Sequence, residues 1–166
     1  MTLKLSYKSK NWLLILHILF AAIMLGNMVV FLIFSITAAA SNDKSVIYAC
    51  YQAMNILSGT SVRASTIGTT VTGVLLSIWT KWGLFKFYWI IVKEGLTLLL
   101  IGLNIWAMYA WTLQAVSGIN ESEELETISF VQAELWTGII FQIISLLLMY
   151  VISVFKPWGK LAGASQ

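Results

Sequence analysis

Residues 11–42 read NWLLILHILFAAIMLGNMVVFLIFSITAAASN, and none of them carries a fixed charge. A helix needs about 20 mainly apolar residues to cross a bilayer. This stretch exceeds that length, and it is about twice as long as the apolar region of a cleaved signal peptide. It therefore predicts a first membrane span at about residues 12–37.

Three further stretches without charge follow, at residues 64–80, 95–120 and 135–155. With their flanking residues they predict spans at about 62–80, 87–115 and 134–155. The chain is 59% hydrophobic and only 10% charged, whereas soluble domains are about 25% charged. We therefore expect an all-α, polytopic membrane protein, a four-transmembrane-helix bundle that forms one domain over residues 1–166.

The segment before the second span is also expected to be helical. Apolar residues recur at close to a 3.6-residue period between positions 46 and 57, and Asn42 or Asp43 is suited to cap the helix start. A helix that continued to Thr80 would be about 57 Å long. The second helix should therefore extend beyond the membrane, with its first turns outside.

The distribution of charged residues predicts the orientation of the chain in the membrane. Four spans place both termini on one side, and that side collects most of the basic residues: Lys4, Lys8, Lys10, Lys81, Lys86, Lys156 and Lys160. The other side has the loop with Glu121, Glu123, Glu124 and Glu126. The positive-inside rule then predicts a plasma-membrane protein with both termini in the cytoplasm. The basic excess indicates contact with anionic lipid headgroups and not with nucleic acid.

Small residues recur every fourth position in the second span, at Ser61, Ser65, Thr69 and Gly73. Such a ridge lets another helix approach closely. The partner is either a helix of the same bundle or a second copy of the chain, which would make a homo-oligomer through this ridge. Alternatively, the ridge forms a polar pathway or lines a cofactor or solute.

Polar residues at membrane depth are the candidate functional residues, because their burial in lipid is costly. His17, Lys93 and Glu94 all lie about 9 Å from the basic ends of their spans, and are expected to form one cluster. The alternatives are a hydrogen-bonded structural histidine and a lysine that reaches cytoplasmic water, with Glu94 beside it.

Asn27 and Asn104 are expected at a matching depth nearer the other face, as a ligand pair or as hydrogen-bonding glue between helices. Arg63 and Glu134 are placed at the outer ends of their helices, where a structural ion pair is the simplest interpretation.

Metal chemistry is restricted by composition. The single cysteine and single histidine exclude an internal disulfide and a multi-histidine metal cage within one chain. A haem iron needs an axial ligand, and His17 is the only histidine available. A second ligand would come from Met108, Met149, Lys93, an open site or His17 of another chain.

Two stretches carry a resemblance to known proteins. They are LHILFAAIMLGN at residues 16–27, which contains His17, and KWGLFKFYWIIVK at residues 81–93, which ends on Lys93. Together they resemble an uncharacterised family of predicted bacterial integral membrane proteins within the CopD-like group. That group is similar to the copper-resistance D proteins and the HemJ-type protoporphyrinogen oxidases.

The resemblance implies a bacterial cytoplasmic membrane, with His17 as a haem b ligand and Lys93 as part of the same cofactor site. Three functional classes therefore stay open for this integral membrane protein of unknown function: haem binding or redox association through His17, small-solute or ion transport as an oligomer, and a non-catalytic accessory or scaffold role. Whether it is an enzyme is left undecided.

Overall fold

The computed structural model describes residues 6–79, 83–121 and 125–159, and the elements in this part of the chain are all helices. In chain order they are α1 (Tyr7–Ala40), α2 (Lys44–Leu57), the π-helical turn η1 (Ser58–Val62), α3 (Arg63–Trp79), α4 (Tyr88–Gly102), the π-helical turn η2 (Leu103–Ala107), α5 (Met108–Glu121) and α6 (Leu125–Phe155). Because η1 joins α2 to α3 and η2 joins α4 to α5, they form four long helices. The predicted all-α four-helix architecture is confirmed.

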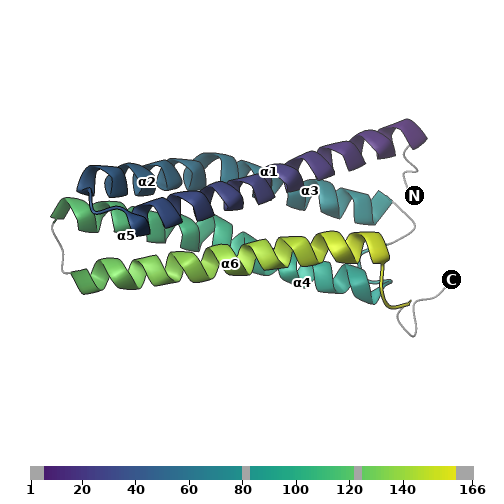
Figure 1. Ribbon diagram of the computed structural model, residues 1–166. Helices are drawn as coiled ribbons and strands as arrows, with labels where there is room; N and C mark the ends of the chain where they lie inside the picture. Colours follow the sequence, from purple (N-terminus) through teal and green to yellow (C-terminus); the bar gives the residue numbers. More distant parts are fainter. Residues whose placement is uncertain (1–5, 80–82, 122–124, 160–166) are drawn as a thin grey trace.

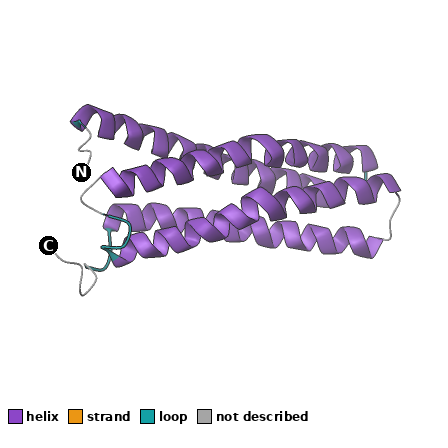
Figure 2. Cartoon of the chain, turned by 180° about the vertical axis from the view of Figure 1, so that it is seen from behind, coloured by secondary structure: helices purple, strands orange, loops and turns teal. Residues whose placement is uncertain are grey.

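The four helices lie side by side along one axis (Figures 1 and 2). The helix α1 packs on α2, α3 and α6, while α5 packs on α2 and α6. The start of α1 and the end of α6 lie at the same end of the bundle (Figure 1). We call this the terminal end, and the opposite end, with the α1–α2 and α5–α6 connections, the loop end.

Three of the four helices are long and apolar enough to cross a membrane: Tyr7–Ala40, Tyr88–Ile119 and Ser129–Phe155. The span predicted at 62–80 is not among them, and its last residue, Thr80, lies outside the described residues. The serine, threonine and glycine residues of α3 lower its hydropathy. This helix is shielded by its neighbours on the face that carries buried Ser65, Thr66 and Thr72.

The first and last helices begin earlier than the predicted spans. The Ser6 side chain accepts a hydrogen bond from the Ser9 amide and caps α1, so Lys8 and Lys10 lie inside that helix. Likewise, α6 begins at Leu125 and contains Glu134. A charged residue ends a charge-free window but does not end a helix, which explains the difference.

The predicted cap of the second helix is confirmed. Asp43 Oδ1 accepts a hydrogen bond of 2.8 Å from the Ser45 amide, and α2 begins at Lys44. The second helix does not project alone, however, because α1 and α5 flank α2 along its length. With 34 residues, α1 is itself about 51 Å long.

The bundle is therefore longer than the roughly 30 Å hydrocarbon core of a bilayer. Exposed aromatic side chains suggest which part is embedded: Trp12 and Tyr88 lie near the terminal end, and Trp106, 81% exposed, lies on η2. Along the third helix, Tyr88 and Trp106 are about 27 Å apart, and interfacial aromatics mark the edges of a membrane. The distance is close to the thickness of the hydrocarbon core of a bilayer.

Candidate functional site

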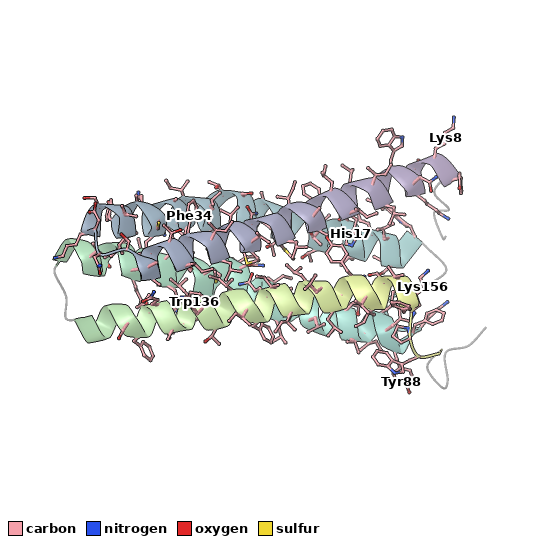
Figure 3. All side chains as sticks on the ribbon, in the orientation of Figure 1. Lys8, His17, Phe34, Tyr88, Trp136 and Lys156 are labelled. Carbon is pink, nitrogen blue, oxygen red and sulfur yellow. The ribbon has the colours of Figure 1, made fainter. Side chains whose placement is uncertain are left out.

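The only histidine faces α3 from α1 (Figure 3). His17 Nδ1 lies 3.1 Å from the Thr69 carbonyl oxygen and 3.0 Å from Thr72 Oγ1. The carbonyl can only accept, and the Thr72 hydroxyl already donates to the Gly68 carbonyl at 2.6 Å. Both contacts therefore place a proton on Nδ1, and in the neutral imidazole the lone pair then lies on Nε2.

The small-residue ridge of α3 makes this contact possible. A Cβ atom at Gly73 would lie 3.1 Å from His17 Cε1, and one at Gly68 would lie 2.7 Å from the Phe20 ring. The ridge residue Ser61 bonds to Asn27 of α1, so α1 occupies this face. The ridge packs within the bundle, and a homo-oligomer would need another surface.

Lys93 lies on the other side of the bundle, on α4. Its Nζ donates a hydrogen bond of 2.6 Å to Ser153 Oγ of α6 and lies 6.0 Å from the centre of the Trp89 ring. The side chain is partly buried. The structure thus brings His17 and Lys93 to the same half of the bundle.

Glu94 does not join them through a hydrogen bond or an ion pair in the described part of the chain. Its Oε1 is buried and has no partner, and Lys93 bonds to Ser153 instead of to its neighbour. Consecutive residues point about 100° apart around a helix, so similar depth did not imply a shared face.

Asn27 and Asn104 are both buried, but they do not bond to each other. Asn27 exchanges two hydrogen bonds with Ser61, of 3.0 and 3.1 Å. Asn104 Nδ2 lies 3.8 Å from the sulfur of Met24, and its Oδ1 has no protein partner. Asn27 therefore joins two helices, as expected of hydrogen-bonding glue, whereas Asn104 is incompletely paired.

Arg63 and Glu134 do not form the predicted ion pair. Arg63 Nη2 donates to the Ile105 carbonyl at 3.2 Å, and its guanidinium lies 4.5 Å from the centre of the Tyr109 ring. Because η1 continues the helix, Arg63 is also not at a helix end.

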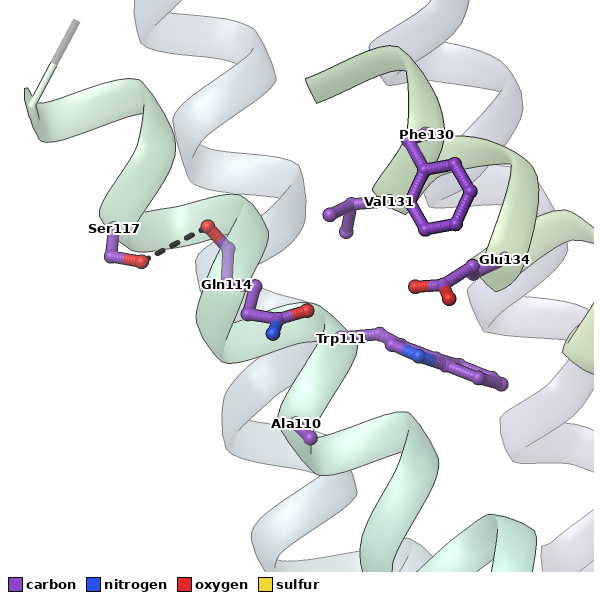
Figure 4. A pocket seen from close by; sticks show the side chains of 7 residues that line it. All are labelled: Ala110, Trp111, Gln114, Ser117, Phe130, Val131 and Glu134. Atoms are coloured by element: carbon purple, nitrogen blue, oxygen red, sulfur yellow. Dashed lines mark hydrogen bonds between the residues drawn. The ribbon is translucent and has the colours of Figure 1, made fainter. Parts of the chain in front are cut away.

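Glu134 instead lines a pocket of about 400 Å³ between α5 and α6, beside Trp111 and Gln114 (Figure 4). Arg63 faces η2 and the start of α5, while Glu134 faces a different side of α5. The position of a residue along its helix, which the sequence gives, does not tell which side of α5 its side chain faces.

The structure reduces the number of residues that could bind a metal ion or a haem iron. Among the described residues, no group of three or more His, Cys, Asp or Glu side chains could hold a metal ion. Met108 is fully buried in the loop-end half, near Trp111 and Gly138. It is about ten residues further along the bundle than Thr97 and Met149, which contact each other beside Lys93. Met108 is therefore not placed to share an iron with His17.

Three residues of this region were not foreseen from the sequence. They are Thr72, which fixes the His17 ring, Ser153, which binds Lys93, and Gln142, which is fully buried in α6. Gln142 could have been noticed as the amide that interrupts an apolar run. Thr72 and Ser153 carry no such signal, since hydroxyl residues are common in membrane helices and usually bond to their own backbone.

Comparison of the chain with protein families, curated proteins and solved structures found no match. The opening of the second resembling stretch, Lys81 and Trp82, lies outside the described residues.

Proposed function

We propose that this membrane protein binds haem b through Nε2 of His17. The observation that supports the proposal is the pair of acceptors at Nδ1, the Thr69 carbonyl and the Thr72 hydroxyl. Ligating histidines commonly donate their second ring N–H to such a partner, which fixes the tautomer and orients the coordinating nitrogen. The same arrangement of hydrogen bonds surrounds Nδ1 of the single imidazole in this chain.

Lys93 would complete the site by binding a haem carboxylate through its ammonium group, which is partly buried and held by Ser153. A further protein ligand to the iron, where one is used, would be Met149, Lys93 itself or His17 of a second chain. A bound haem would supply one-electron redox chemistry. The chain's part is to orient the imidazole and to keep bulk water from it within the bundle.

The experiment is the visible spectrum of the protein purified in detergent and supplied with haem, recorded oxidised and after dithionite reduction. We expect a Soret band in the wild type and its loss in His17→Ala. Thr72→Val is the matched control, because it removes one acceptor from Nδ1 but keeps the Thr69 carbonyl and the ligand. It should retain the band with weaker haem affinity.

A wild-type protein that stays colourless after haem supplementation would exclude the proposal. A band of equal intensity in a folded His17→Ala variant would exclude His17 as the ligand. Either result would favour the transport or accessory classes, which flux into liposomes and co-purification of partner proteins would then separate.

We also propose that the terminal end faces the cytoplasm of a bacterial cell. The described basic residues Lys8, Lys10, Lys86 and Lys156 lie at or near this end, which supports the positive-inside assignment. Cysteines introduced at Lys8 and at Asn42 in a Cys50→Ser background test it with a membrane-impermeant maleimide on intact cells. Labelling at residue 42 alone is expected, and labelling at residue 8 alone would reverse the orientation.

A further inference from the structure

Two amide side chains in the middle of the bundle have polar atoms without a hydrogen-bond partner. Asn104 and Gln142 are both fully buried, at 0% exposure. Asn104 Oδ1, Gln142 Oε1 and Gln142 Nε2 have no partner in the protein. Buried amides are nearly always paired, with protein groups or with ordered water.

The register between α4 and α6 places these two residues at the same level of the bundle. Lys93 bonds to Ser153, and Thr97 contacts the sulfur of Met149 at 3.7 Å. In this antiparallel pair, each step forward along α4 is a step backward along α6.

Asn104 follows Lys93 by about three helical turns, and Gln142 precedes Ser153 by the same distance. Three turns return a side chain to nearly the same face. Asn104 and Gln142 therefore lie at the same level of the bundle, about three turns from the level at which Lys93 meets Ser153.

The other two long helices contribute residues of α1 and α3 at the same level. The Met24 sulfur accepts contacts from Thr66 Oγ1 at 3.4 Å and from Asn104 Nδ2 at 3.8 Å. Each of the four long helices thus has one residue at this level, which we call the layer: Met24, Thr66, Asn104 and Gln142. It lies about two turns from His17 along α1.

We propose that this layer binds water inside the bundle. The unpaired groups are two acceptors and one donor, and a water molecule donates two hydrogen bonds and accepts up to two. Buried waters typically make about three hydrogen bonds to polar groups that the protein leaves unpaired. The π-helical turn η2, which begins one residue before Asn104, adds support, since such turns are frequent at functional sites.

Radiolytic hydroxyl labelling tests the proposal, because radicals formed from a bound water oxidise the side chains that touch it. Met24 is 3% exposed and adjoins the layer. Met28, at 0% exposure one turn further along α1, has no described hydrogen bond and is the matched control. Water in the layer should make Met24 oxidise several-fold faster than Met28, as measured by mass spectrometry of the protein in nanodiscs.

The double variant Asn104→Leu/Gln142→Leu should slow the oxidation of Met24 to the rate of Met28 and leave exposed residues unchanged. Equal, slow rates for the two methionines in the wild type would overturn the proposal without any variant. Fast oxidation of Met24 that persists in the folded double variant would also overturn it. Neither outcome depends on haem, so this proposal and the haem proposal can fail separately.

Discussion

Gly68 is the position at which one added methyl group should test the packing of α1 on α3. A Cβ atom there would lie 2.7 Å from Cγ and Cδ1 of Phe20 and 2.8 Å from Cδ2. Contacts below 3 Å are repulsive, so the ring or the helix must move. Overpacking of this kind typically costs about 1–3 kcal/mol.

Gly26 provides the matched control, because a Cβ there would meet nothing within 4 Å. Alanine is also the better helix former by about 0.5–1 kcal/mol, and both substitutions gain this term. Gly68→Ala should therefore be less stable than Gly26→Ala by about 1–3 kcal/mol, even if its net loss against the wild type is smaller.

The assay is equilibrium unfolding in mixed micelles with increasing dodecyl sulfate, followed by circular dichroism. Phe20→Leu in the Gly68→Ala background should recover part of the loss by removing the ring that the new methyl group meets. Equal stability of Gly68→Ala and Gly26→Ala would refute the reasoning, because it would show that the Phe20 ring moves into lipid at no cost.

Two other contacts and one buried thiol give predictions that the same kind of measurement can test. A double-mutant cycle of Asn27→Ala and Ser61→Ala should give a coupling free energy of about 0.6 kcal/mol, and at most about 1.7, in the same unfolding assay. If the two losses of stability were additive, the hydrogen bonds between these side chains would contribute nothing. Tyr109→Leu should lose about 0.5–1 kcal/mol of cation–π stabilisation with Arg63, while Tyr109→Phe keeps it; equal losses in both would contradict this. Burial raises the pKa of the Cys50 thiol, so the folded state disfavours the thiolate and its stability should fall as pH rises above 9.0, the ordinary value. Unfolding curves of the wild type and Cys50→Ala from pH 8 to 10 should then converge or cross, and parallel curves would show no contribution from the thiol.

The helices were predictable because long apolar stretches separated by charge have few other structures available in a membrane. Their ends were less predictable, since Lys8 and Glu134 lie within helices and do not end them. The cap at Asp43 was foreseen because it depends on local chemistry alone, a carboxylate just before an amphipathic segment.

The candidate site was predictable in depth but not in direction. His17 and Lys93 share one half of the bundle because distance along a helix follows directly from residue number. Which neighbour each side chain faces depends on how the helices rotate against each other. That rotation pairs Lys93 with Ser153 and separates Arg63 from Glu134.

The two π-helical turns have a consequence for the angular phase of the inward-facing residues. Buried residues recur at every fourth position through both turns, as at Met54, Ser58, Val62 and Thr66. In an uninterrupted α-helix this spacing would drift by about 40° per step, or about 120° over three steps. Each wide turn cancels part of that drift. Removing one residue from the turn at 58–62 should therefore leave Met54 facing the core, because the 11 residues that would then separate it from Thr66 make about three turns of an ordinary α-helix.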